Sequence, residues 1–259
     1  MKDVRNMEIE SAAAGKPHQG KVLAAIFPHC DDFSIFAGGT IAKLLAEGYV
    51  GYLIRTTNDE MDSWDLSVGE TILAIERETQ EMAQVLGIRK VYDLNYKNHY
   101  LDQALVVEMR HRLIALFRFL KVDTVLSFDP WGHYEENPDH YFTAMAVVQA
   151  CWMAGRRLDL PELADMGLEP HYVDEKYYCA RGPQLANRVV DISSVIGTKL
   201  RAIETNRTPM NNMLNAYRQK GGKVGSVDEM ARGHFIDSVD SGFPGFIHGE
   251  VFHYIGPEV

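Results

Sequence analysis

The chain has 259 residues, of which 46% are apolar, and a formal net charge of −10. This apolar fraction is ample for a buried core, and the length fits one large α/β domain or two small ones. The acidic balance, without any cluster of Lys and Arg, argues against a nucleic-acid partner.

Neither a membrane span nor a secretory signal is expected. No apolar stretch approaches the ~20 residues that a spanning helix needs, and residues 1–20 lack an apolar signal core. We expect residues 1–20 to form a flexible arm and residues 21–259 to form a single domain. The three cysteines, Cys30, Cys151 and Cys179, are few and unpatterned, which favours a reducing compartment and therefore a cytoplasmic protein.

Strand and helix patterns alternate from residue 21 onward. Strands are predicted at 21–27, 49–57, 90–94, 124–128, 171–180 and 189–192. Helices are predicted at 39–47, 68–86, 101–120, 142–155, 195–204 and 227–232. This order predicts a Rossmann-like three-layer α/β sandwich with a mostly parallel sheet. The Gly-rich stretch 217–246 is interpreted as a lid, because loops of this length in compact domains are often lids.

Side chains suited to a metal ion follow the first strand, in the run Pro28-His29-Cys30-Asp31-Asp32. His29 offers a ring nitrogen, and the two carboxylates would repel each other unless a cation or a proton relieved them. Adjacent carboxylates rarely both face one ion, so His29 and Asp32 are the expected ligands and Asp31 the expected base. The alternative is a polar loop in which Asp31 or Asp32 caps the next helix.

A second polar segment follows the strand 124–128. It reads Asp129-Pro130-Trp131-Gly132-His133-Tyr134-Glu135-Glu136-Asn137-Pro138-Asp139-His140. The carboxyl ends of parallel strands meet at one edge of a sheet, where binding sites collect. We therefore expect the two polar segments to converge on one site.

Together the two segments resemble the zinc-dependent N-acetylglucosaminyl deacetylases related to LmbE and PIG-L. In that family a strand ends in His-Pro-Asp-Asp/Glu, then Gly-Gly-Thr follows, and a His-Pro-Asp-His element comes later; here Gly38-Gly39-Thr40 and Asn137-Pro138-Asp139-His140 stand at comparable places. The resemblance implies one zinc ion per chain, held by His29, Asp32 and His140, with Asp31 as the general base. Three protein ligands leave one coordination position open, as in catalytic zinc sites.

Two positions depart from the family pattern. Cys30 stands where the family usually has Pro, and Asn137 stands where many members have a His that serves as general acid or oxyanion donor. We therefore expect His133 or His248 to protonate the leaving amine, unless Asp31 returns the proton that it takes.

Substrate contacts are expected from three further residues. Tyr134 and Asn137 belong to the second polar segment, and Arg77 lies in the helix 68–86, where the family carries an Arg and a Glu near the substrate. Lys199 stands where the family commonly has Lys, although an exposed helix lysine explains it equally well.

The expected chemistry is hydrolysis of the N-acetyl group of a GlcNAc-like sugar or sugar conjugate by metal-activated water. The expected partner is thus a small N-acyl amino sugar, and the sequence leaves a homo-oligomer open. Two alternatives remain: an amidase acting on another amide such as a thiol conjugate, and a metal- or sugar-binding protein with little catalysis. Asp31 argues against the last, because a purely structural zinc gains nothing from an unligated carboxylate beside it.

Overall fold

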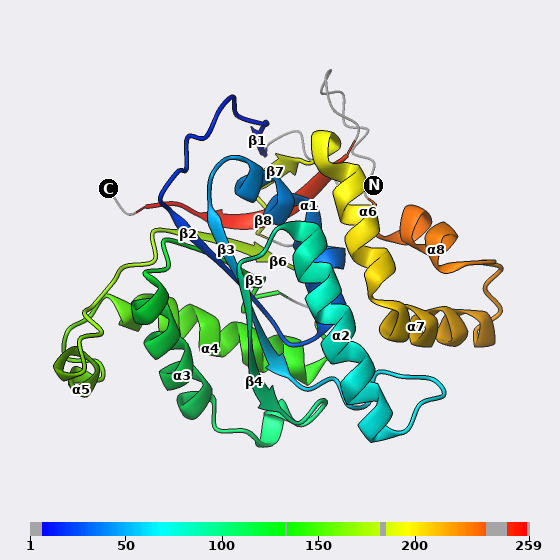
Figure 1. The fold of residues 1–259 in the computed structure, drawn as a ribbon, viewed down its shortest axis with the longest axis horizontal. Coiled ribbons are helices and arrows are strands. Elements are labelled where there is room, and N and C mark those ends of the chain that lie inside the picture. Colours follow the sequence, from blue (N-terminus) through cyan, green and yellow to red (C-terminus); the bar gives the residue numbers. More distant parts are fainter. Residues whose placement is uncertain (1–6, 133, 182–184, 237–247, 258–259) are drawn as a thin grey trace.

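The computed structural model describes residues 7–132, 134–181, 185–236 and 248–257. Its middle layer is an eight-stranded sheet with the order β1-β7-β8-β6-β5-β2-β3-β4 (Figure 1). The strands are β1 Glu8–Glu10, β2 Val22–Phe27, β3 Val50–Thr57, β4 Lys90–Tyr96, β5 Thr124–Phe128, β6 Glu175–Cys179, β7 Arg188–Asp191 and β8 Gly249–Ile255. Strand β8 runs antiparallel to its two neighbours, and the other pairs are parallel. The predicted mostly parallel α/β sandwich is confirmed.

Helices cover both faces of this sheet. They are α1 Cys30–Ala46, α2 Val68–Leu86, α3 Val106–Leu120, α4 Pro138–Ala154, α5 Pro161–Asp165, α6 Ile196–Thr205, α7 Arg207–Gln219 and α8 Val227–His234. Short 3-10 turns at Leu101–Gln103 and Ser193–Val195 precede α3 and α6. Helices α3 and α4 lie on one face and α1, α2 and α6 on the other, while α7 and α8 extend beyond α6 (Figure 1).

Strand β2 shows why the sheet is buried on both sides. Leu23, Ala25 and Phe27 pack into the core beneath α1 and α2, while Ala24 and Ile26 face the core beneath α3 and α4. All five side chains are fully buried. A strand covered on both faces reads as a continuous apolar run rather than as an alternation, which is the pattern of the sequence 22–27.

Most predicted helices and strands match the structure within a few residues, but α1 begins at Cys30 instead of Gly39. A glycine pair usually weakens a helix, so the sequence analysis placed the start at the second glycine of the pair. At Gly39, however, an added Cβ would lie 2.6 Å from Ile192 Cδ1. Close packing of α1 against the segment after β7 therefore requires the glycine inside the helix.

The segment 1–20, expected from its sequence to be a flexible arm, contains a strand. Residues 8–10 form β1, which pairs in parallel with β7. Glu10 holds the strand in place by accepting hydrogen bonds from the side chains of Lys43, Tyr177 and Arg188. These three partners lie on separate elements, so no local pattern in the sequence points to them.

The predicted lid region is partly helical. Helix α8 packs with α6 and α7 around a small apolar core that includes Ile203, Met210, Leu214 and Met230. The sequence did not predict α7, and residues 237–246 of the predicted lid lie outside the described part of the chain.

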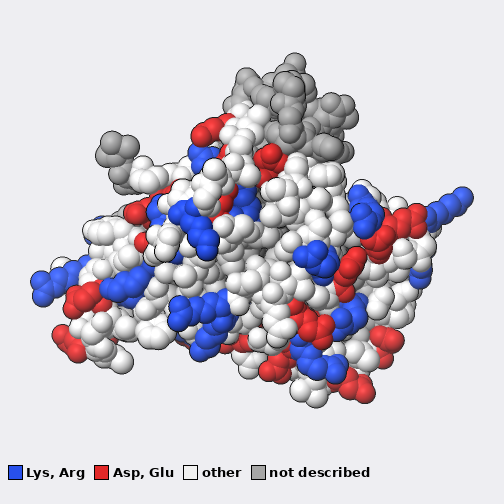
Figure 2. Space-filling view, turned by 45° about the horizontal axis from the view of Figure 1, so that its top comes forward, with Lys and Arg blue, Asp and Glu red and all other residues white. Residues whose placement is uncertain are grey.

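The distribution of surface charge and the length of the helices also bear on the expectations from the sequence. On the face shown in Figure 2, acidic and basic side chains are interspersed rather than gathered by sign. Within the described ranges, no helix is both long and apolar enough to cross a membrane.

Candidate active site

The two polar segments meet where the strand order reverses. Strands β3 and β4 lie to one side of β2, while β5 and β6 lie to the other, so β2 and β5 flank the switch point of the sheet. His29 directly precedes α1 at the end of β2, and His140 lies in the first turn of α4 after β5. Ligands in open α/β sheets bind in the crevice at such a point.

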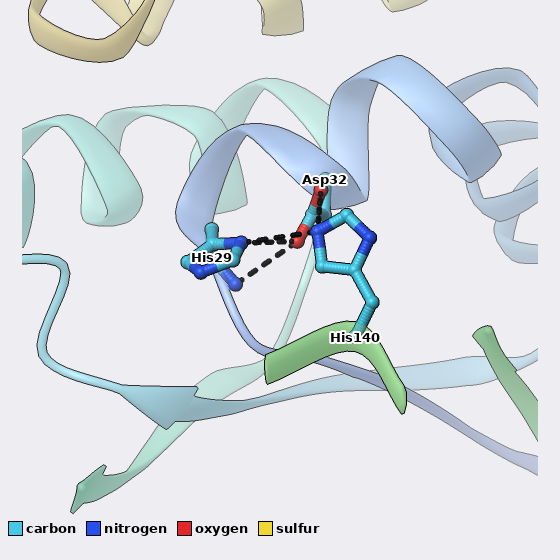
Figure 3. Close-up of side chains that lie close together, drawn as sticks. All are labelled: His29, Asp32 and His140. Atoms are coloured by element: carbon cyan, nitrogen blue, oxygen red, sulfur yellow. Dashed lines mark hydrogen bonds and ion pairs between the residues drawn. The ribbon is translucent and has the colours of Figure 1, made fainter. Parts of the chain in front are cut away.

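His29, Asp32 and His140 come together as a buried triad (Figure 3). One ligand atom from each lies within 4.8 Å of those of the other two. His29 Nδ1 is 3.0 Å from one oxygen of Asp32, and His140 Nε2 is 3.5 Å from the other. The two ring nitrogens are themselves 3.3 Å apart. Two imidazoles and one carboxylate facing a common point are a donor set that fits a divalent transition-metal ion.

Asp32 also caps the helix, so the two predicted roles of this carboxylate coexist. Its Oδ2 accepts a hydrogen bond from the backbone N–H of His29 at 3.1 Å. This capping interaction fixes the first turn of α1 and thereby the direction in which both His29 and Asp32 point.

Two further carboxylates hold the outer nitrogens of the histidines. Asp139 Oδ2 lies 3.2 Å from His29 Nε2, and Glu135 Oε2 lies 3.1 Å from His140 Nδ1. A carboxylate behind a ligating histidine orients the ring and directs its other nitrogen to the metal. The sequence analysis assigned neither residue to the site, although Asp139 stands directly before a predicted ligand.

The adjacent Asp31 and Asp32 have opposite pKa shifts. Burial, reinforced by the charge of Asp32, raises the pKa of Asp31 well above its usual range. Burial also acts on Asp32, but His140 and His29 outweigh it and lower the pKa of that carboxyl. Environments that separate two neighbouring carboxyl groups in this way suit Asp32 to remain an anionic ligand and Asp31 to accept a proton.

A cavity of about 600 Å³ opens beside the triad. This volume falls in the range of about 300–1,000 Å³ typical of small-molecule sites. Asp31 and Asp62 line its polar side, together with the triad, and its apolar wall includes Ile35, Phe36, Met213 and Phe235. The cavity therefore offers both charged groups and hydrocarbon surface.

Comparison with known proteins identifies the family. Residues 24–151 match the family described as PIG-L, GlcNAc-PI de-N-acetylase. The diacetylchitobiose deacetylase of Thermococcus kodakarensis is 33% identical over 195 residues, which cover 73% of this chain and 70% of that protein. The chain belongs to the PIG-L family. It is a deacetylase, an amide hydrolase, as the two motifs predicted.

Solved structures agree with this assignment. The N,N'-diacetylchitobiose deacetylase of Pyrococcus horikoshii has a TM-score of 0.76 and 27% identity, covering 91% of this chain and 84% of that one. A 4-carboxy-2-hydroxymuconate hydratase, GalB of Pseudomonas putida, has a TM-score of 0.66 and 19% identity, covering 92% and 98%. The second likeness shows the fold alone, and the fold by itself does not specify a reaction.

Several residues predicted for the PIG-L site do not line the cavity among the residues described. Arg77 is exposed on α2, whereas the next residue, Glu78, turns inward and accepts hydrogen bonds from Thr208. Tyr134 is 88% exposed. His248 is partly buried just before β8, where the lining begins with Gly249. The phase of α2 decides the orientation of Arg77, and the path of the loop between β5 and α4 decides that of Tyr134; the motif resemblance supplied neither.

Two other predicted residues need separate statements. His133 lies outside the described residues. Asn137 does line the cavity, and its side-chain oxygen caps α4 by accepting the backbone N–H of Asp139 at 2.9 Å.

Lys199, whose role the sequence analysis left undecided, forms a buried ion pair at the cavity. Lys199 Nζ lies 2.7 Å from Glu250 Oε1, and neither residue is more than 4% exposed. The two oxygens of Glu250 accept the backbone N–H groups of Gly39 and Thr40 at 2.9 and 2.7 Å, while Lys199 donates to the carbonyl of Ile35. In a regular α-helix the N–H of Gly39 would pair with that carbonyl. The ion pair therefore inserts into the hydrogen-bond ladder of α1, two turns beyond the triad.

Proposed function

We propose that this protein removes the acetyl group from a GlcNAc unit of a short acetamido sugar such as N,N'-diacetylchitobiose, using one zinc ion per chain. The observation that carries the proposal is the buried His29–Asp32–His140 triad with Asp31 beside it in the same cavity. The activity named for its relatives from Thermococcus kodakarensis and Pyrococcus horikoshii supports the choice of substrate.

His29, Asp32 and His140 would hold the zinc. When bound, the ion would polarise the acetamide carbonyl and lower the pKa of a coordinated water toward about 7. Asp139 and Glu135 lie against the outer nitrogens of the two histidines and favour the ring orientations in which the inner nitrogens face Asp32.

Asp31 is proposed as the general base. It lines the cavity, is 6% exposed and is not one of the three ligands. Its raised pKa makes the carboxylate a better proton acceptor than an ordinary Asp, which suits it to take a proton from the attacking water. The apolar side chains Phe36 and Phe235 reduce the water around the sugar and favour reaction within the cavity.

A cytoplasmic location is proposed as well. All three cysteines are free and buried. Thiols kept unpaired are typical of proteins in reducing compartments.

The test is acetate release from N,N'-diacetylchitobiose, from GlcNAc and from an N-acetylated thiol conjugate. Zinc-loaded wild type would be compared with Asp31→Asn, and zinc per chain would be measured in both. Loss of a general base lowers the rate by about 10²–10⁴-fold, and we expect the variant to keep its zinc. The control is Glu76→Gln, because Glu76 is exposed on α2.

Two results would count against the proposal. Zinc-loaded wild type that releases acetate from the thiol conjugate but from neither sugar would favour the alternative amidase. An Asp31→Asn variant with wild-type turnover would remove Asp31 from the role of base.

A further inference from the structure

The proposed deacetylation needs a general acid, and no residue has yet been assigned to this role. As the C–N bond breaks, the nitrogen of the sugar must gain a proton before it departs as an amine. Asn137 does not supply it, because an amide side chain is not an acid at neutral pH and its oxygen is occupied by the cap of α4. The remaining candidates are Asp31, if it returns the proton that it takes, and the histidines near the cavity, of which His133 lies outside the described residues and His248 does not line the cavity.

Four histidines line the cavity in the described part of the chain: His29, His99, His140 and His234. His29 and His140 face Asp32 as proposed metal ligands. His99 and His234 remain as proton donors, and the sequence analysis singled out neither.

The backbone of His99 is unusual. It lies in the loop after β4 with φ at +63°, in the left-handed region. Glycine adopts this conformation readily, whereas a side chain with a Cβ is disfavoured there. Residues held in such conformations cluster at functional sites, because the surrounding structure has to enforce them. Asp59, Asn95, Lys121, Tyr134 and Leu160 share this conformation among the described residues, and His adopts it more often than most side chains, so the contacts of the ring decide its use.

Asp139 enforces the position of His99. Its Oδ2 accepts the backbone N–H of His99 at 2.6 Å, and its Oδ1 accepts that of Leu101 at 3.2 Å. The same Oδ2 contacts His29 Nε2 at 3.2 Å. One buried carboxylate thus links the loop that carries His99 to a ligand of the proposed metal.

The ring of His99 lies within reach of the site and of water. Its centroid is 6.2 Å from that of His29, at an interplanar angle of 72°. The residue is exposed, so it can recover a proton from solvent after each turnover. His234 ends α8 and is exposed as well, but its ring packs against Tyr217, with centroids 5.2 Å apart, rather than against a residue of the triad.

We propose that His99 is the catalytic acid of this deacetylase, an inference that rests on the proposed function. A ring N–H of His99 gives its proton to the sugar nitrogen while the electron pair of the breaking C–N bond moves to that nitrogen. The carbonyl re-forms as acetate, the amino sugar leaves, and His99 takes a new proton from water. Asp31 releases the proton of the attacking water to solvent, so that the overall reaction consumes one water.

The test is His99→Gly, because glycine accepts φ at +63° and keeps the N–H that Asp139 binds. We expect turnover of N,N'-diacetylchitobiose to fall by about 10²–10⁴-fold, with zinc per chain and thermal stability unchanged or improved. Added imidazole should restore part of the rate, because it can occupy the space of the missing ring. His234→Ala serves as the comparison and should retain most of the activity.

Each other outcome overturns the proposal. Wild-type turnover in His99→Gly excludes an acid role, as does a loss that follows zinc content or that imidazole does not restore. A larger loss in His234→Ala than in His99→Gly would assign the proton to His234. Failure of the wild type to release acetate would overturn the proposed function first, and with it the need for an acid.

Discussion

Asp139 offers a stringent test of the site, because one buried carboxylate supports both a metal ligand and a loop. It is fully buried and accepts hydrogen bonds from two backbone N–H groups and from Asn98 Nδ2, besides its contact with His29. Burial alone would raise its pKa, but His29 and the N–H of His99 outweigh burial and lower it. In Asp139→Asn the shape is kept, while one acceptor oxygen becomes an NH₂ group.

The structure sets the size of the effect. If the amide oxygen faces His29 and His99, the NH₂ group opposes the N–H of Leu101, and an unsatisfied buried donor costs about 1–3 kcal/mol. Loss of charge assistance in the remaining bonds adds about 1 kcal/mol, giving a loss in unfolding free energy of about 2–4 kcal/mol. Zinc affinity should also fall by about 10–100-fold, because Asp139 no longer directs the ring of His29.

Thermal unfolding of the metal-free protein and zinc competition against a chelator measure the two effects separately. The control is Glu78→Gln, the same change at a buried carboxylate that binds Thr208 on α7. It should lower stability and leave zinc affinity unchanged. Wild-type zinc affinity in Asp139→Asn would refute the argument that this carboxylate orients a metal ligand.

Two predictions concern stability away from the metal. Replacing Gly by Ala usually stabilises a helix by up to about 1 kcal/mol, but Gly39→Ala should destabilise by about 1–3 kcal/mol, because its Cβ would meet Ile192 at 2.6 Å. Gly69→Ala in α2, where nothing lies within 4 Å, is the matched control, and equal denaturation midpoints for the two variants would contradict the packing argument. Glu175 accepts hydrogen bonds from Lys21, Tyr49 and Tyr254. Burial would raise its pKa, but these donors lower it, so its contribution is present above the unfolded pKa of about 4.3 and is lost as pH falls through the folded pKa. Glu175→Gln should therefore be less stable than wild type at pH 7, and denaturant unfolding should show this difference shrinking below about pH 4; a constant difference would count against it.

Local patterns were sufficient for the alternating order of most strands and helices and, together with the family resemblance, for the candidate metal triad. Buried parallel strands appear as apolar runs, and the helices between them have their own periodicity. His29 and Asp32 lie within one turn of helix, so their convergence needs no long-range information. The choice of His140 came from the family resemblance, whereas the rule that parallel strands place their carboxyl ends at one edge of the sheet only brought the two segments together.

Tertiary structure alone decided which other side chains reach the cavity. Arg77 and Tyr134 belong to segments that resemble the family, yet they point to solvent, while His99, missed by the motifs, lines the cavity. The start of α1 was misplaced because local propensity disfavours a glycine pair, whereas Glu250, 211 residues away in sequence, binds the N–H of Gly39. Contacts of this kind depend on how distant elements pack against one another. They cannot be predicted from the local residue pattern or from the spacing of residues along one chain.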